Sequence, residues 1–221
     1  MYRHIVFDLD GTLIDTETTS LVSLHDTILE VLGEDRDLES LRYYFSIPSG
    51  KVGAHLGAPD EKLFIDTWNR KWDELVDLTR PFEGALETVR LAHDLGMTVG
   101  CVSSRIEPEF YGDRHLQSVI DCFDVVVLAG DTPHHKPSPE PMLLFMEKAS
   151  GKTGRTVLPE ECLFLGDTKA DCDCAQGSGA HFALADWSCR GTQGMAPEYH
   201  FQKMSDLQEF LKGQAEQVVL Q

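Results

Sequence analysis

The stretch Ile5-Val6-Phe7-Asp8-Leu9-Asp10-Gly11-Thr12 places two carboxylates directly after a short apolar run. The apolar run predicts a buried strand, and Gly11 allows the chain to turn sharply where that strand ends. In an extended chain Asp8 and Asp10 would point to opposite faces, so the turn is needed to bring the second carboxylate around. This arrangement suits an anionic nucleophile beside a partner that handles protons.

Short apolar runs recur along the chain and alternate with helix-like stretches, which predicts an α/β fold with a mostly parallel sheet covered by helices. The strand candidates are 5–7, 97–102, 123–128, 163–165 and 181–185. Helices are expected over 84–95 and 140–149. The pattern Ser205-Asp206-Leu207-Gln208 resembles a capping box and predicts the start of a last helix that runs through Leu211.

Residues 16–80 follow a different pattern, because apolar residues there keep a helical spacing and no strand candidate stands out. Helices are expected over 21–32, ending at Gly33, and over 38–45, 51–56 and 63–75. An all-helical segment directly after the first strand of an alternating pattern is read as an insertion. The sequence therefore predicts a core formed by residues 1–15 and 81–221, with an inserted helical domain over 16–80.

Composition and charge narrow the possible partners. The 221 residues carry a net charge of −18, from 37 acidic and 19 basic residues, and this balance repels a nucleic-acid backbone and an anionic membrane surface. The six cysteines show neither a Cys-x-x-Cys pair nor a disulfide framework, so they are expected to serve in packing. No apolar segment of signal or membrane-span length is present, and the cytoplasm is the expected location.

Reactive side chains follow several predicted strands, at the end where open α/β sheets bind ligands. Ser103 follows the second strand candidate, and its hydroxyl can hold a phosphate oxygen. Lys136 stands just before the helix expected from residue 140. In Gly166-Asp167-Thr168-Lys169-Ala170-Asp171 the two aspartates are four residues apart, so a helical turn would place both on one side.

If the polar residues that follow these strands form one site, that site contains four carboxylates, from Asp8, Asp10, Asp167 and Asp171. Two unit charges 4 Å apart repel by about 4 kcal/mol at an effective dielectric constant near 20. A hard divalent cation relieves that repulsion, and oxygen ligands from carboxylate, phosphate and water are typical of Mg²⁺. The sum is a pocket whose cation and lysine attract a phosphate.

Together, and in this order, the four motifs resemble those of the haloacid dehalogenase (HAD) superfamily. The resemblance covers residues 3–15 and 81–211, and the run 166–171 followed by Ala175 and Gly179 matches the family's fourth motif closely. It implies a Rossmann-like parallel core. The helical insert stands where the family has its small C1-type cap, a match by position and helicity only.

The resemblance implies Mg²⁺-dependent hydrolysis of a small phosphomonoester, phosphoglycolate-like or a sugar phosphate, through an aspartyl-phosphate. Asp8 would be the nucleophile, and Asp10 would protonate the leaving oxygen and then activate water. Ser103 and Lys136 would bind the transferring phosphoryl group. The implied metal set is the side chains of Asp8 and Asp167, the backbone carbonyl of Asp10, and Asp171 as a direct or indirect support.

Identities within the motifs distinguish branches of the family. Haloacid dehalogenases proper lack the second aspartate and phosphonatases have alanine there, so Asp10 argues against both. Thr12 is typical of phosphatases, whereas mutase relatives often carry valine. The cap and the length resemble phosphoglycolate phosphatases and pyrophosphatases of this branch.

Further substrate contacts are expected beside these motifs. Ser103-Ser104-Arg105 stands where many relatives have Thr-Asn-Lys, so Ser104 and Arg105, with Thr12, are candidate contacts to an anionic substrate. Residues 46–51 stand where C1 caps carry a specificity loop.

Two alternatives stay open at this point: phosphoryl transfer like that of a phosphoglucomutase, and a non-catalytic binding protein on the same scaffold. Each motif alone also has an ordinary interpretation, since Asp and Gly favour turns and aspartates cap helices. The expected partner is a small phosphorylated metabolite, with no nucleic acid or membrane, and the protein is expected to be a monomer or homodimer.

Overall fold

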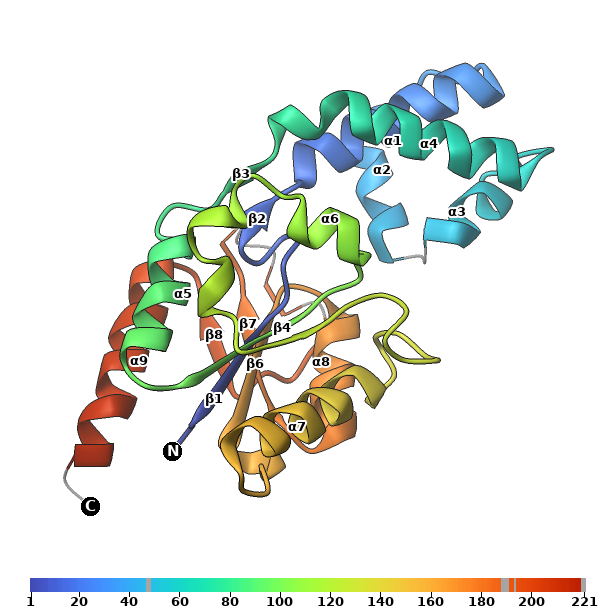
Figure 1. Cartoon of the computed structure of the whole chain (residues 1–221). Helices are drawn as coiled ribbons and strands as arrows, with labels where there is room; N and C mark the ends of the chain where they lie inside the picture. The colour runs from blue at the N-terminus through green and yellow to red at the C-terminus, as the bar shows by residue number, and fades with distance from the viewer. Residues whose placement is uncertain (47–48, 188–190, 193, 220–221) are drawn as a thin grey trace. The chain divides into compact units, whose positions relative to one another are not determined.

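The computed structural model describes residues 1–46, 49–187, 191–192 and 194–219, and the chain divides into two compact units (Figure 1). The larger unit comprises Met1–Ile14 and Pro81–Gln221, and the smaller one comprises Asp15–Arg80. Within the described residues, no helix is both long and apolar enough to span a membrane.

A six-stranded sheet in the order β5-β4-β1-β6-β7-β8 forms the centre of the larger unit, and its neighbouring strands run parallel. The strands are β1 (His4–Phe7), β4 (Thr98–Val102), β5 (Val125–Val127), β6 (Cys162–Gly166), β7 (His181–Ala185) and β8 (Tyr199–Phe201). Apolar runs predicted the first five, so the α/β class is confirmed. The sequence did not predict β8, because the exposed His200 at the centre of this edge strand interrupts any apolar run.

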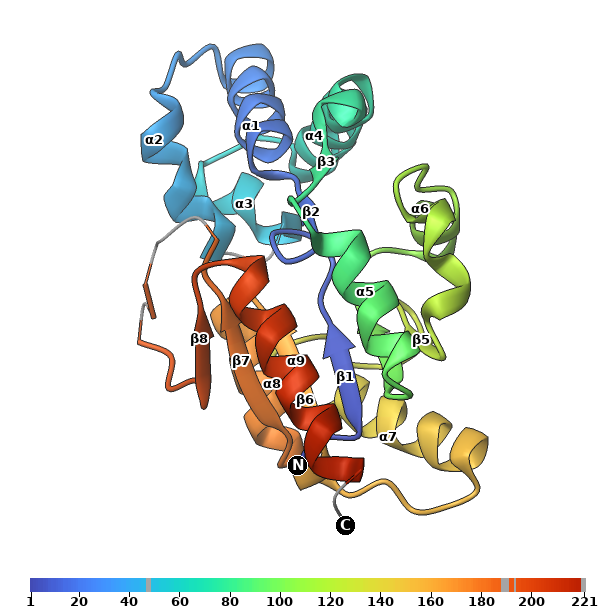
Figure 2. The same cartoon turned by 90° about the vertical axis from the view of Figure 1, so that its left-hand side faces the viewer.

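Helices cover both faces of this sheet, as Figures 1 and 2 show. The first face carries α5 (Ala85–Asp94) and α9 (Met204–Val219), and the second carries α7 (Glu140–Thr153) and α8 (Lys169–Ser178). In β1, Ile5 and Phe7 pack with the α5 side, whereas Val6 packs with α7 and α8. Because both faces are buried, the strands read as continuous apolar runs rather than as alternating ones.

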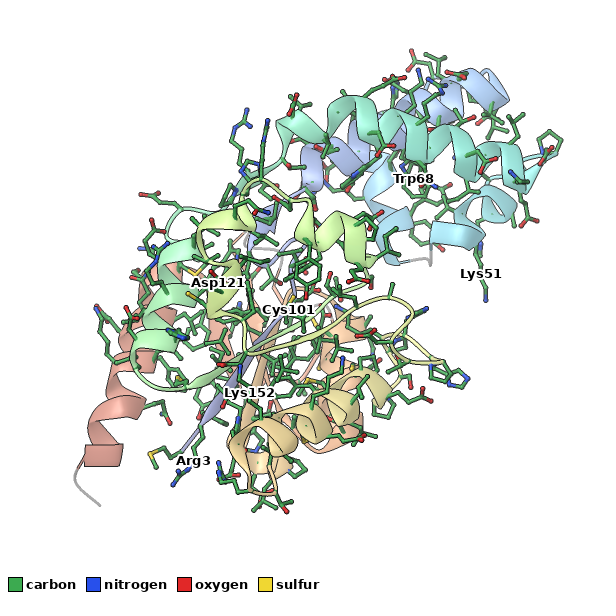
Figure 3. The ribbon with its side chains drawn as sticks, viewed as in Figure 1. Arg3, Lys51, Trp68, Cys101, Asp121 and Lys152 are labelled. Atoms are coloured by element: carbon green, nitrogen blue, oxygen red, sulfur yellow. The ribbon has the colours of Figure 1, made fainter. Side chains whose placement is uncertain are left out.

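Buried cysteines take part in this packing. Cys101 of β4, labelled in Figure 3, has no exposed surface and belongs to the cluster on the α5 side. Cys172 and Cys174 of α8 belong to the cluster on the opposite face. The expected packing role of these thiols is confirmed.

Short helical segments connect several strands of the larger unit. Between β4 and β5 lie α6 (Glu107–Tyr111) and the 3₁₀ helices η3 (Leu116–Ser118) and η4 (Ile120–Cys122), and η5 (Pro159–Glu161) precedes β6.

The predicted start of the last helix was wrong. Helix α9 begins at Met204, so Ser205 lies inside it and its hydroxyl donates to Oδ1 of Asp206 at 3.2 Å. The helix also continues to Val219, beyond the expected end at Leu211.

The smaller unit is helical and has its own core. It contains α1 (Glu17–Leu32), α2 (Leu38–Leu41), η1 (Arg42–Ser46), α3 (Ser49–His55), α4 (Glu61–Leu75) and η2 (Val76–Leu78). Gly33 ends α1 in the left-handed conformation, at φ 70°, as expected. Trp68 projects from α4 into this core (Figure 3), and its indole N–H donates to Ser23 Oγ at 3.0 Å. The helix expected over 38–45 is instead a short α-helix followed by a 3₁₀ helix.

Two very short strands mark the places where the chain passes from one unit to the other. They are β2 (Ile14–Asp15) and β3 (Arg80–Pro81), and they pair with each other in a two-stranded sheet. Neither was expected, because two residues carry no periodicity that a sequence pattern could detect.

Gly100 lets α7 approach the sheet closely. A Cβ atom on Gly100, in β4, would lie 2.2 Å from Cε2 of the fully buried Phe145 of α7. An added methyl group at this position must therefore displace either the aromatic ring or the strand.

We expect Gly100→Ala to lower the free energy of unfolding by about 1–3 kcal/mol through overpacking. The matched control is Gly151→Ala in α7, where an added Cβ meets nothing within 4 Å. Because alanine favours the helix, this control should raise stability by roughly 0.5–1 kcal/mol. Urea unfolding of both variants measures the difference, and equal midpoints would contradict the close approach.

Candidate active site

The reactive side chains begin where neighbouring strands of the sheet end. Asp8 directly follows β1, and its N–H donates to the carbonyl of Leu165 in β6 at 2.8 Å. Ser103 follows β4, and its N–H donates to the carbonyl of Val127 in β5 at 3.0 Å. The sheet's hydrogen bonding thus continues past the strand ends and fixes the backbone from which these side chains project.

Three carboxylates form a compact cluster at this edge. Asp8, Asp167 and Asp171 each offer an oxygen atom within 4.8 Å of the others. Asp171 is completely buried, and its Oδ2 accepts from the N–H and hydroxyl of Thr168, at 3.0 and 2.5 Å, at the start of α8. Thr12 Oγ1 lies 3.5 Å from Asp167 Oδ1. The sequence motifs after β1 and β6 therefore meet in space.

Lys136 lies against this cluster. Its Nζ is 2.6 Å from Asp8 Oδ1 and 2.7 Å from Asp171 Oδ1, and it also donates to the carbonyl of Val102 at 3.2 Å. The ammonium group also lies 5.7 Å from the ring centre of Phe164. When all three carboxylates are ionised, one ammonium leaves two negative charges uncompensated.

Burial and crowding shift the pKa values of these groups. Burial raises the pKa of Asp8 to about 7, against the opposing charge of Lys136 and with the support of Asp171. Burial raises the pKa of Asp167 well above its usual range, and the charges of Asp171 and Asp8 add to this. Burial opposes the charge of Lys136, but the Asp171 and Asp8 carboxylates outweigh it and raise the pKa of the ammonium. The hard oxygen donors and uncompensated charge fit a divalent metal ion.

Glycines allow the backbone to come this close to the carboxylates. Gly11 has φ 83°, and a Cβ there would lie 2.3 Å from Asp167 Oδ2. At Gly166 an added Cβ would lie 2.5 Å from the Cβ of Asp171. The loop after β1 is also fixed from its other side, because the indole N–H of Trp187 donates to the carbonyl of Thr12 at 2.8 Å.

Asp10 forms its ion pair with Arg105 rather than with Lys136. Arg105 Nε donates to Asp10 Oδ2 at 2.9 Å, and Nη2 donates to Asp10 Oδ1 at 2.7 Å. Nη1 of the same guanidinium donates to Asp113 Oδ2 at 2.6 Å. The two aspartates of the opening motif thus have separate cationic partners, Lys136 for Asp8 and Arg105 for Asp10.

The three candidate substrate contacts lie in different environments. Thr12 has no exposed surface and its hydroxyl is directed to Asp167, so it supports the carboxylate cluster. Ser104 is exposed on the loop after β4. The guanidinium of Arg105 forms ion pairs with two carboxylates of the chain itself, those of Asp10 and Asp113. In the expected specificity loop over 46–51, residues 47 and 48 lie outside the described residues.

Two residues that support the candidate site, Asp113 and Trp187, were not predicted from the sequence. Asp113 anchors Arg105, and no local pattern marks it, because the contact depends on how the chain folds between β4 and β5. Trp187 comes soon after the end of β7, and that position at the ligand-binding edge is a signal that could have identified it.

Comparison with known proteins agrees with this geometry. The sequence model of the haloacid dehalogenase-like hydrolases matches residues 5–185. The chain belongs to this family. A pyrophosphatase PpaX from Bacillus pumilus is 28% identical to this hydrolase over 212 residues, which cover 92% of this chain and 93% of that protein. A PpaX from Anoxybacillus flavithermus is also 28% identical, covering 94% and 95%.

Solved structures show the same fold at lower sequence identity. A proposed phosphoglycolate phosphatase from Lactobacillus plantarum superposes on this hydrolase with a TM-score of 0.80 at 23% identity, covering 95% of this chain and 99% of that one. CbbY from Rhodobacter sphaeroides, solved in complex with phosphate, gives a TM-score of 0.73 at 20% identity, covering 94% and 96%.

We expect Gly11→Ala to leave this hydrolase folded but to weaken divalent-cation binding, because the new methyl group collides with Asp167. The matched control is Gly33→Ala, which has a similar positive φ but nothing within 4 Å. Both variants should lose roughly 1–2 kcal/mol of stability to backbone strain. Only Gly11→Ala should lose most of the rise in melting temperature that Mg²⁺ or Mn²⁺ produces, and an equal rise in both variants would contradict the expectation.

Proposed function

We propose that the protein is a Mg²⁺-dependent phosphatase that hydrolyses a small phosphomonoester through an aspartyl-phosphate intermediate. The observation that carries this proposal is the contact of Lys136 Nζ with both Asp8 and Asp171, in a cluster with excess negative charge at the ligand-binding edge of the sheet. The relatives named as pyrophosphatases also support phosphoryl chemistry.

Each reacting group has a proposed role. A carboxylate oxygen of Asp8 attacks phosphorus, and the bond from phosphorus to the leaving oxygen breaks. Asp10 gives its proton to that leaving oxygen, then takes a proton from the water that attacks the aspartyl-phosphate. Hydrolysis returns Asp8 as a free carboxylate and releases inorganic phosphate. Lys136 and Ser103 hold the phosphoryl oxygens through an ammonium group and a hydroxyl.

The side chains of Asp8 and Asp167, the carbonyl of Asp10 and the supporting Asp171 would hold Mg²⁺, which supplies positive charge next to the phosphoryl oxygens when bound. Within the chain itself, Lys136 compensates part of the charge on Asp8 and Asp171. Thr168 fixes the orientation of Asp171 through its N–H and hydroxyl.

The helical segment 16–80 would serve as a C1-type cap on a core formed by residues 1–15 and 81–221. In this role it excludes water until the phosphoenzyme has formed and selects the leaving group. The substrate class would be a small metabolite such as a phosphoglycolate-like compound or a sugar phosphate, with the cytoplasm as the location and a monomer or homodimer as the assembly.

Phosphate release from an aryl phosphate and a panel of metabolite phosphates, with and without Mg²⁺, tests the reaction. We expect activity that requires Mg²⁺ and that falls on the order of 10³-fold or more in Asp8→Asn, because the amide cannot act as the nucleophile. The matched control is Asp121→Asn, the same change at an exposed aspartate of η4 (Figure 3).

Three results would overturn this proposal in different ways. No activity of the wild type across the panel would favour a non-catalytic binding protein. Full activity of Asp8→Asn would exclude the aspartyl-phosphate. Interconversion of sugar-phosphate isomers faster than phosphate release would identify a phosphoglucomutase-like enzyme.

The raised pKa of Asp8, about 7, predicts how stability depends on pH in the absence of metal. The unfolded chain releases this proton near pH 4, so between about pH 4 and pH 7 the folded state binds more protons and stability falls as pH rises. Mg²⁺ competes with protons for the carboxylates, so it should raise the melting temperature more at pH 8 than at pH 6. Calorimetry with EDTA or Mg²⁺ measures this, and a Mg²⁺ effect equal at both pH values would contradict it.

A further inference from the structure

Arg105 holds both carboxylate oxygens of Asp10 in a fork. The Nε–Oδ2 distance is 2.9 Å and the Nη2–Oδ1 distance is 2.7 Å, so the contact is bidentate. A bidentate pair fixes the plane of the carboxylate as well as its distance, which a single hydrogen bond does not. An aspartate side chain without such a partner rotates about two bonds.

Arg105 is itself held from the other side. Its Nη1 donates to Asp113 Oδ2 at 2.6 Å, and the other oxygen of Asp113 accepts the N–H of His115 at 2.7 Å. The backbone of Arg105 is also fixed, since its N–H donates to Ser103 Oγ at 3.2 Å and its carbonyl accepts from Ala129 N–H at 2.9 Å. Hydrogen bonds to both the side chain and the backbone of Arg105 therefore hold its guanidinium in place.

Burial increases the strength of this chain of contacts. The side chains of Asp10, Arg105 and Asp113 are 36%, 14% and 8% exposed, so solvent screening decreases from the outer aspartate to the inner one. Burial opposes the charge on Arg105, but the hydrogen bonds to Asp10 and Asp113 outweigh it and raise the pKa of the guanidinium. An arginine stays charged in proteins, and the donors of Arg105 are directed at Asp10 and Asp113.

We propose that Arg105, anchored by Asp113, is the positioning residue for Asp10. It holds the acid–base carboxylate in one orientation, and it acts on the reaction through Asp10 rather than by binding the substrate phosphate. Asp10 already binds the Nε–Nη2 edge of the guanidinium, which is an edge that can bind a phosphate through two hydrogen bonds. This inference rests on the proposed phosphatase function, in which Asp10 protonates the leaving oxygen.

A positioning role has a kinetic signature that depends on the leaving group. When the bond from phosphorus to the leaving oxygen breaks, an alkoxide needs the proton of Asp10, whereas a nitrophenolate leaves without much help. We expect Arg105→Met to lower kcat/KM for an alkyl phosphate about 10²-fold and that for p-nitrophenyl phosphate only a few-fold. Inhibition by inorganic phosphate should be unchanged, because phosphate binding does not use Arg105.

Two further variants keep the test valid if Arg105→Met fails to fold. Arg105→Lys restores the charge without the fork and should recover only part of the alkyl phosphate activity. Asp113→Asn weakens the anchor without touching Asp10 and should give the same leaving-group pattern at smaller size. Arg90→Met, at an exposed arginine of α5 that donates to the Ser118 carbonyl, is the matched control and should change nothing.

A double-mutant cycle decides between positioning and direct substrate binding. If Arg105 acts through Asp10, Arg105→Met should have little further effect on kcat/KM in an Asp10→Asn background. Additive losses, or phosphate inhibition weakened about tenfold, would overturn the positioning role while the phosphatase function stands. Failure of the proposed phosphatase function has its own signs, namely an inactive wild type or a fully active Asp8→Asn variant. Either result would also overturn the positioning role of Arg105.

Discussion

Electrostatic repulsion among three crowded carboxylates, of which Asp8 and Asp171 are buried, is the constraint on which the rest of the site depends. Asp8, Asp167 and Asp171 lie within 4.8 Å of one another, and Lys136 compensates only one of their charges. Two charges 4 Å apart cost about 4 kcal/mol at an effective dielectric constant near 20, which is a large fraction of the net stability of a small domain, roughly 5–15 kcal/mol. The packing of the α/β core must therefore offset this electrostatic repulsion.

The parallel sheet holds the cluster because its strands cannot separate without losing both cores. Asp8 extends from β1 and Asp167 follows the adjacent β6, and side chains from both strands are buried beneath helices on each face. The same burial that rigidifies the strands also removes water from the carboxylates, which is why the pKa of Asp8 is raised. Gly11 then lets the loop approach Asp167, where any larger residue would collide.

The sequence predicted those features that follow from local patterns. Apolar runs located five strands of the main sheet, and the positions directly after β1, β4 and β6 marked Asp8, Ser103 and Asp167. Lys136 was marked by the helix that follows it and Asp171 by its spacing from Asp167. It did not predict β8, because the exposed His200 stands between its two aromatic residues and no apolar run marks the strand. Nor could it show that Arg105 binds Asp10 and Asp113, because that pairing depends on the tertiary path of the chain after β4.

The different cations beside Asp8 and Asp10 fit different chemical demands. An ammonium group is a point charge, and the hydrogen bond from Lys136 to Asp8 uses Oδ1 alone. In the proposed reaction, Oδ2 would therefore be the oxygen that approaches phosphorus. A guanidinium at that position would occupy both oxygens and oppose the attack. In the proposed reaction, Asp10 transfers a proton in a defined direction. The planar fork of Arg105 would fix that direction, and it leaves a second lone pair on each Asp10 oxygen for the proton. The proposed mechanism, in which two aspartates separated by one residue perform different steps, thus agrees with partners that differ in shape as well as in position.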